Sequence, residues 1–188
     1  EKKFPSGSLT AITDLVRGRS IRSYRHKPKS VVIAIRDVAQ ALQHANSAGA
    51  FHGSLLPECV MIDKDGAGHL LDFGLHHALE NAIAGGSIRL PRISSRYKPP
   101  ERLRSPGTGD ARSEVYGLGA VFYYGLARQP PGTGDIIAPR KLRGGIPRPI
   151  QDVCLRCLKH APNERYPDAG GLAADLDAFI QTGPRRRR

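Results

Sequence analysis

The clearest pattern in the chain is an amphipathic helix expected over residues 31–45. Its apolar residues recur every three or four positions, which places them on one helical face: they are Val31, Ile35, Val38, Leu42 and Ala45. Ser30 precedes this face and is the expected N-cap, and Gly49 follows it where a helix can end. We therefore expect a helix of about four turns with one face against a core.

Further helices are expected along the chain. Residues 111–123 form an apolar stretch too long for a strand and predict a buried helix. A final helix is expected after Asp168, its N-cap, and before Gly183. Its apolar residues are Leu172, Leu176, Phe179 and Ile180. A short helix near the start is expected from the spacing of Leu9, Ile12, Leu15 and Val16.

Two short strands are expected between residues 60 and 71. The apolar run at residues 60–62 and the pair Leu70 and Leu71 flank a turn at residues 63–66, which contains Asp-Gly, a strong hairpin signal. The hairpin brings together the polar residues that precede it and those that follow it. The next stretch, residues 76–95, has no periodicity and predicts a mobile loop.

Length and composition favour one globular domain. The 188 residues can bury a sizeable core, and no run approaches the roughly 18 apolar residues that a membrane span needs. The chain begins with Glu1 and has no signal-peptide pattern, so we expect it to be cut from something longer. The expected location is the cytoplasm, including the cytoplasmic part of a membrane-anchored protein.

The net charge of +12 raises the question of a phosphate-bearing partner. Basic residues cluster at residues 17–29 and in the run from Arg185 to Arg188, but the interleaved aromatic residues of a single-strand binding groove are lacking. We expect solvated surface and a flexible basic tail over residues 183–188, and nucleic acid is not expected as a partner. The alternative is an anionic membrane surface contacted by Arg185 to Arg188.

The three cysteines predict no disulfide framework. Cys154 and Cys157 form a C-x-x-C within an apparently helical stretch, where we expect small buried side chains rather than zinc or redox ligands. The sequence Pro-Gly-Thr-Gly-Asp occurs at residues 106–110 and 131–135 without the Lys-Ser/Thr of a phosphate-binding loop. Both copies are therefore expected to be ordinary loops before and after a helix.

Two loops at the ends of the expected hairpin carry a recognisable pattern. It consists of His52, Gly53, Ser54 and Cys59 before the hairpin, and Asp72, Phe73 and Gly74 after it. In order and spacing they resemble the catalytic loop and the magnesium loop of eukaryotic-type Ser/Thr protein kinases, whose patterns are H-R-D-L-x-x-x-N and D-F-G. The resemblance implies structural roles for His52, Phe73 and Gly74.

Further positions match the same family in the same order. Pro100 and Glu101 resemble the end of the A-P-E motif. Glu114 stands where the family has an aspartate that hydrogen-bonds the catalytic-loop backbone, and Arg165 matches an arginine that pairs with the glutamate of A-P-E. The resemblance therefore implies an ion pair between Glu101 and Arg165. It covers nearly the whole chain, begins at the hinge where the small lobe would end, and is strongest to the bacterial members.

The resemblance also implies a site that has lost most of its chemistry. Ser54 stands at the catalytic aspartate, and loss of a general base costs about 10²- to 10⁴-fold in rate. Leu56 replaces the usual lysine, and Cys59 stands at the metal-binding asparagine although thiols prefer softer metals than magnesium. Gly53 replaces an arginine that often receives an activation-loop phosphate. Asp72 alone remains, either as a ligand of magnesium and a nucleotide or as a residue that orders the loop.

Two other chemistries use neighbouring residues. Ser54 could act as a nucleophile with His52 as its base, but the family histidine at this position usually supports the loop. A metal site beside Asp72 could use His69, His76 and His77. We expect neither, because the first needs a tuned geometry and the second needs loop neighbours to converge without a scaffold.

We therefore expect a mainly α fold, a protein-kinase-like large (C-terminal) lobe over residues 1–182 with the small (N-terminal) lobe absent. A helical bundle would carry a small β-ribbon with the catalytic and metal loops. The expected function is that of a pseudokinase, a binding, scaffolding or regulatory module with a protein partner. No cofactor is expected. Mg-ATP would be the cofactor if any activity or nucleotide binding remains. The alternatives are an active Ser/Thr kinase whose small lobe lies outside this chain, and a basic membrane- or phosphate-binding module.

Overall fold

The computed structural model of the chain describes residues 14–23, 27–73, 95–104 and 110–182. Its helices are α1 (Pro28–Ser47), α3 (Pro100–Arg104), α4 (Ala111–Ala127), α5 (Pro139–Leu142), α6 (Arg148–Cys157) and α7 (Ala169–Thr182). Short 3-10 turns occur at η1 (Pro57–Cys59), η2 (Ser95–Tyr97) and η3 (Pro162–Glu164). The strands are β1 (Gly18–Ser20), β2 (Val60–Asp63) and β3 (Gly68–Leu70), so the described fold is mainly helical.

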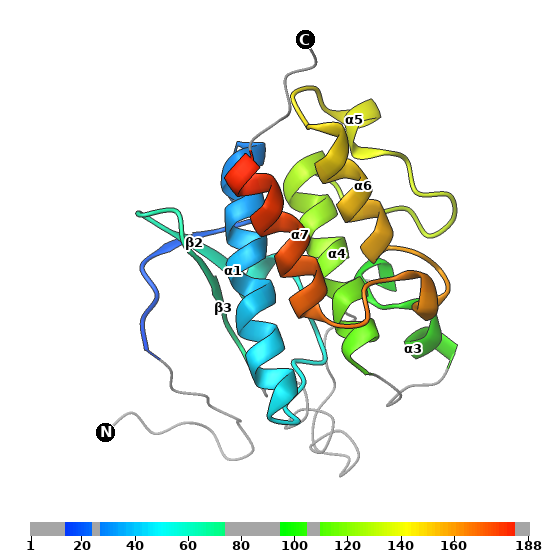
Figure 1. Cartoon of the computed structure of the whole chain (residues 1–188), viewed down its shortest axis with the longest axis horizontal. Coiled ribbons are helices and arrows are strands. Elements are labelled where there is room, and N and C mark those ends of the chain that lie inside the picture. Colours follow the sequence, from blue (N-terminus) through cyan, green and yellow to red (C-terminus); the bar gives the residue numbers. More distant parts are fainter. Residues whose placement is uncertain (1–13, 24–26, 74–94, 105–109, 183–188) are drawn as a thin grey trace, which may run out of the picture.

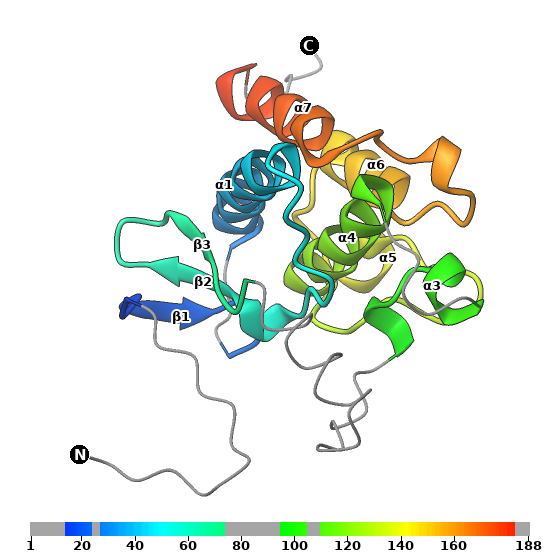
Figure 2. The same ribbon diagram turned by 90° about the horizontal axis from the view of Figure 1, so that it is seen from below.

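The helices pack around α1 and α4 (Figures 1 and 2). Helix α1 lies between the sheet and α4, and it runs along α7. Helix α6 packs against α4 on the side away from the sheet. The sheet is antiparallel in the order β1-β2-β3, with Arg19 opposite Ile62 and Met61 opposite His69. The hairpin of β2 and β3 therefore lies at one side of the helical body.

Helix α4 is the centre of the core. Every residue of the helix except Ala111, Arg112 and Tyr124 is buried. The apolar run at residues 111–123 predicted this burial, and the helix continues to Ala127 before Arg128 adopts a left-handed conformation with φ of +66°. Such a helix is held by packing on all of its faces rather than by an amphipathic stripe.

The amphipathic helix over residues 31–45 is confirmed as the central part of α1, but its predicted N-cap is wrong. The helix begins at Pro28, so Ser30 lies within its first turn and Lys27 is the N-cap. Proline suits this position because its ring fixes φ at a helical value and the missing N–H has no helical partner there. Gly49 follows the helix with φ of +76°, as expected for a helix end.

The predicted hairpin is confirmed, but the third strand, β1, was missed. Its three residues are short, polar and basic, and they pair with β2 only because the fold brings them there. The short helix expected near the start is not seen at residues 14–17, where the chain is irregular and Leu15 is 81% exposed. The remainder of that predicted helix, and most of the loop at residues 76–95, lie outside the described residues.

The last two helices agree with the sequence. Cys154 and Cys157 are buried free thiols in α6, and no cluster of three potential metal ligands occurs in the part of the chain that the structure describes. Asp168 caps α7, since its Oδ1 accepts a hydrogen bond from the Gly171 N–H at 2.9 Å. Of the repeated pentapeptides, residues 131–135 are irregular, and Asp110 caps α4; residues 106–109 lie outside the described residues.

A close backbone contact fixes the hairpin on α1. A Cβ atom at Gly68 would lie 2.2 Å from the Ala34 carbonyl oxygen, so β3 crosses α1 at a distance that only glycine permits. The Gly68 N–H also donates to Asp37 Oδ2 at 2.9 Å. Arg36 binds both Asp37 and Asp177 of α7. The hairpin, and with it the two loops at its ends, is thereby fixed to the helical body.

None of the helices within the described ranges combines the length and the apolar character that a membrane crossing requires.

We predict that Gly68→Ala lowers the free energy of unfolding by about 3 kcal/mol, the upper end of typical overpacking costs, because the clashing atoms belong to the backbone. The matched control is Gly134→Ala, since no atom lies within 4 Å of a Cβ there; it should change stability by less than about 0.5 kcal/mol. Urea denaturation measures both. Equal effects of the two substitutions would contradict the close contact.

Candidate functional site

The loop before the hairpin is held by a buried carboxylate of α4. Glu114 is 4% exposed, and its two carboxylate oxygens accept hydrogen bonds from the backbone N–H groups of His52, at 2.9 Å, and Gly53, at 2.7 Å. Gly53 has φ of +81°, a conformation that strains other residues. The longer side chain of glutamate thus makes the backbone contact expected of an aspartate.

His52 supports both loops through its ring. It is 1% exposed, its Nε2 lies 2.9 Å from the Leu71 carbonyl oxygen, and its Nδ1 lies 3.4 Å from the Ser54 backbone nitrogen. Nδ1 can accept from that N–H only if Nε2 carries the proton and donates to Leu71. The ring also meets the Phe73 ring edge-on, with centroids 5.4 Å apart. His52 therefore joins the loop before the hairpin to the loop after it.

This arrangement leaves Ser54 without a base from His52. Both ring nitrogens of the histidine are engaged with main-chain groups, so neither is directed at the Ser54 hydroxyl. A serine nucleophile needs a base within hydrogen-bond reach. The geometry thus supports the structural role of His52 and gives no support to nucleophilic catalysis by Ser54.

Cys59 and Asp72 lie together, as the two metal-ligand positions of a kinase would. The Cys59 Sγ is 4.0 Å from Asp72 Oδ2 and 3.9 Å from the Ser54 carbonyl oxygen. Burial raises the pKa of the Cys59 thiol to about 11, and the carboxylates of Asp72 and Glu58 add to the shift. At neutral pH Cys59 is a protonated thiol, so it donates to these oxygens rather than binding a cation.

The pair does not fit magnesium. Mg²⁺ prefers oxygen ligands in octahedral geometry, and only Asp72 of this pair offers oxygens. The exposed Asp72 also adopts φ of +61°, so the loop turns sharply at this residue. The alternative metal site is not assembled by the described residues, since His69 pairs with Asp63 at 2.8 Å; His76, His77 and Gly74 lie outside the described residues.

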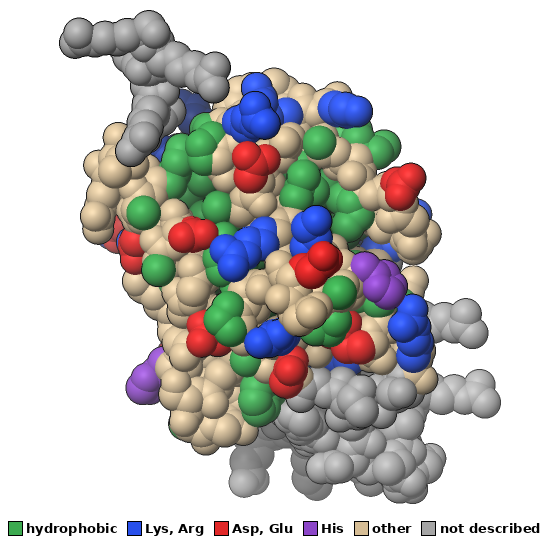
Figure 3. Space-filling view, turned by 45° about the vertical axis from the view of Figure 1, so that its right-hand side comes forward, with side chains coloured by type: hydrophobic (Ala, Val, Ile, Leu, Met, Phe, Trp, Pro, Cys, Tyr) green, Lys and Arg blue, Asp and Glu red, His purple; other side chains and the backbone are tan. Residues whose placement is uncertain are grey.

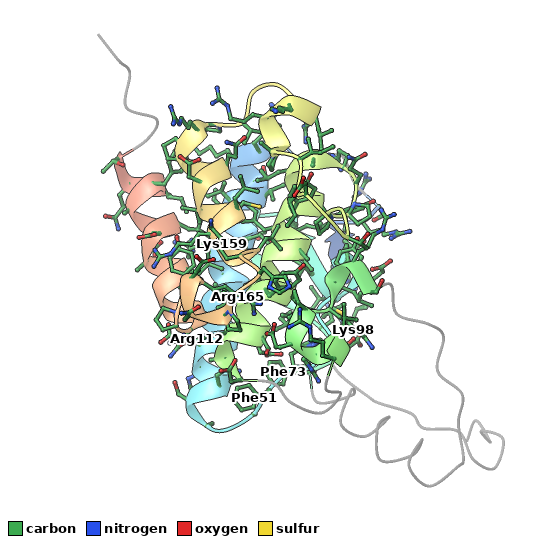
Figure 4. All side chains as sticks on the ribbon, turned by 90° about the vertical axis from the view of Figure 1, so that its right-hand side faces the viewer. Phe51, Phe73, Lys98, Arg112, Lys159 and Arg165 are labelled. Atoms are coloured by element: carbon green, nitrogen blue, oxygen red, sulfur yellow. The ribbon has the colours of Figure 1, made fainter. Side chains whose placement is uncertain are left out.

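The predicted ion pair between Glu101 and Arg165 is present and bidentate. The Arg165 Nη1 and Nη2 atoms lie 2.7 and 2.8 Å from the two Glu101 oxygens. Arg165 is 2% exposed and also donates to the carbonyls of Lys159, His160 and Arg112, while Ser113 Oγ donates to Glu101. Figure 4 shows Arg165 between the labelled Lys159 and Arg112.

These contacts set the protonation of Glu101. Burial alone would raise its pKa, but the hydrogen bonds from Arg165 and Ser113 outweigh burial and hold the pKa below its usual value. The carboxylate is therefore charged at neutral pH, and the buried guanidinium is neutralised.

Arg102 was not among the residues predicted to take part in the site. Its Nη1 donates to the Gly53 carbonyl oxygen at 2.7 Å, so α3 contacts the loop before the hairpin directly. The two residues are 49 positions apart, and no local pattern relates them. Glu114 thus accepts hydrogen bonds from N–H groups of this loop, and Arg102 donates a hydrogen bond to one of its carbonyl groups.

The fold and site have the features of a protein kinase domain. These are a helical body, a small hairpin between two polar loops, and a buried ion pair that connects the following segment to the body. The family model of the protein kinase domain matches residues 6–169, and the chain belongs to this family. Bacterial serine/threonine-protein kinases are among its relatives. The predictions for residues 183–188 and for Arg185 to Arg188 lie outside the described residues.

The similarity to individual kinases extends over most of the chain. The chain is 31% identical to the serine/threonine-protein kinase PknB of Mycobacterium tuberculosis over 198 aligned positions. This alignment covers 94% of the chain and 31% of PknB. PknB of Mycolicibacterium smegmatis gives the same values. The identity to serine/threonine-protein kinase PknL of Mycobacterium tuberculosis is 32% over 191 positions, 90% of this chain and 47% of PknL. The chain thus spans 31% to 47% of the length of these relatives.

We predict that Glu101→Gln lowers the free energy of unfolding at pH 7 by about 3 kcal/mol, because it leaves the buried Arg165 charge unpaired. Since the folded-state pKa of Glu101 lies below its unfolded value, the pair stabilises fully at higher pH and loses its contribution as the pH falls through the folded pKa. The difference between the variant and the native chain should therefore shrink below about pH 4. Urea denaturation across this range measures it.

The control for this prediction is Glu58→Gln. Glu58 forms an ion pair with Arg22 at 3.2 Å, but both side chains are more than half exposed. Its loss should change stability by less than about 0.5 kcal/mol at any of these pH values. A Glu101→Gln variant that behaves like this control would show that the buried pair contributes nothing to stability.

Proposed function

We propose that this chain is the large lobe of a pseudokinase, a binding and regulatory module that does not transfer phosphate. The observation that carries the proposal is the contact between the Cys59 thiol and the Asp72 carboxylate, with a serine at the position of the catalytic base. Under this proposal the chain retains the fold of a kinase domain but does not carry out the kinase reaction.

The first argument concerns the proton. Phosphoryl transfer to a hydroxyl in this family uses an aspartate that accepts the substrate proton. Ser54 has no charge and no partner that would make it a base, because His52 is engaged with backbone groups. The loss of a positioned base alone reduces a rate by about 10²- to 10⁴-fold.

The second argument concerns the metal. Kinases hold two magnesium ions through an aspartate and an asparagine. Here the asparagine position carries Cys59, whose raised pKa keeps it protonated. A neutral thiol beside Asp72 competes with a cation for the same carboxylate oxygen. Leu56 also leaves the transferring phosphate without the positive charge of the usual lysine.

The proposal concerns the large lobe, to which the hairpin with the catalytic-loop and magnesium-loop positions belongs. In this family the reaction also needs a glycine-rich loop over the phosphates and a strand lysine paired with a helix glutamate, which belong to the small lobe. A protein partner and a cytoplasmic location are part of the proposal.

The alternative is an active Ser/Thr kinase with a small lobe outside this chain. The retained and exposed Asp72 favours it, as do the intact frame around His52 and Glu114 and the names of the relatives. Under this alternative Asp72 would bind magnesium, and other residues would replace the missing base and ligand.

We predict that the full-length protein shows no Mg-ATP-dependent phosphorylation of itself or of a generic Ser/Thr substrate. Millimolar Mg-ATP should also leave its melting temperature unchanged, because only a ligand that binds the folded state raises the melting temperature. The comparison variant restores the family residues, as Ser54→Asp with Leu56→Lys and Cys59→Asn. Phosphorylation by the unmodified protein that disappears in Asp72→Ala would establish the alternative and end the proposal.

A further inference from the structure

A basic groove lies beside α5, remote from the two kinase loops. It has a volume of about 380 Å³ and is lined mainly by Arg140, Lys141, Arg143, Gly144, Gly145 and Gln151. None of the described residues that line it is acidic. The groove therefore concentrates positive charge in a concave surface, where field lines are focused on a bound anion.

The cations at this groove are exposed. Arg140 and Lys141 are exposed on the single turn of α5, and within the described ranges neither forms an ion pair. Arg143 is half-buried and directs its Nη1 to the Leu126 carbonyl oxygen at 3.4 Å, so it shapes the wall of the groove. A bound anion would thus meet the exposed charges of Arg140 and Lys141 and the half-buried charge of Arg143.

The shape of the groove is built by the backbone. The Arg140 N–H donates to Gln151 Oε1 at 3.3 Å, which connects α5 to α6. Gly145 turns the chain with φ of +77°, and Ile146 is buried beneath. No atom lies within 4 Å of a Cβ built at Gly144, so the space above this residue is open.

Two exposed apolar side chains stand next to the lining residues in the sequence. The exposed large hydrophobic residues of the described chain are Leu15, Phe73, Leu103, Ile137 and Leu142. Ile137, 50% exposed, precedes the lining residue Ala138, and Leu142 lies between Lys141 and Arg143. Figure 3 shows Lys and Arg side chains beside hydrophobic ones at the upper end of the molecule, where Figure 1 places α5.

We infer that this groove docks an acidic segment of a partner protein, one in which carboxylates flank an aliphatic side chain. Carboxylates complement Arg140 and Lys141, and the aliphatic side chain covers Ile137 and Leu142. No aromatic residue lines the groove to stack nucleic-acid bases, and a concave surface does not lie flat on a membrane. The inference is independent of the proposed function, because it uses no residue of the kinase loops.

The test measures fluorescence anisotropy of a labelled peptide, Asp-Glu-Glu-Leu-Asp-Glu-Glu, with the full chain at low salt. We expect saturable binding that weakens when salt shortens the reach of the charges. Arg140→Glu with Lys141→Glu should weaken binding at least about tenfold. Gly144→Phe should weaken it similarly by filling the groove without a change of charge, and a peptide with serine in place of leucine should bind less tightly.

The matched control reverses the same charge elsewhere. Lys64 and Lys98 are exposed, and Figure 4 shows Lys98 in the half of the molecule away from α5. Lys64→Glu with Lys98→Glu should change the affinity less than about twofold, because neither lysine lines the groove. Circular dichroism and thermal melting verify the fold of each variant.

Three results would overturn the inference. The first is the absence of saturable peptide binding. The second is peptide binding that neither groove variant weakens more than the control. The third is groove-dependent binding of a single-stranded oligonucleotide or of phosphatidylserine vesicles without binding of the peptide, which would assign the groove to another class of partner.

Discussion

The first turn of α4 is the point on which the site depends. Asp110 caps this turn by accepting from the N–H groups of Arg112 and Ser113, both at 3.0 Å. Ser113 then donates to Glu101 of the ion pair, and Glu114 accepts from the loop before the hairpin. A carboxylate in the first turn of a helix is also favoured by the helix dipole. One buried helix end thereby positions two segments that are far apart in the sequence.

These contacts are made to the main chain, so they do not depend on the side chains at the catalytic positions. Glu114 and Arg102 bind N–H and carbonyl groups, which every residue of the loop would offer. The hydrogen bonds that hold the loop to α4 and α3 use no side-chain atom of Ser54 or Cys59. The residue types at these two positions can therefore vary without breaking those hydrogen bonds.

The sequence predicted what depends on a strong local pattern or on the family resemblance. The burial of α4 followed from one continuous apolar run, and the Glu101–Arg165 pair followed from matched motifs. It did not predict β1, whose strand character comes from pairing with β2, or the contact of Arg102 with Gly53. The start of α1 was misplaced because the favourable N-cap Ser30 hid the preference of proline for the first helical position.

The same helix connects the basic groove to the kinase loops. Near the C-terminal end of α4, the Tyr123 hydroxyl donates to the Ile137 carbonyl oxygen at 2.7 Å, and the Leu126 carbonyl oxygen faces Arg143. The groove is thus anchored to one end of α4 and the kinase loops to the other. Because the helix between them is buried on nearly every face, each end keeps its geometry whatever side chains the other presents. Side-chain replacements in the kinase loops should therefore leave the geometry of the basic groove unchanged.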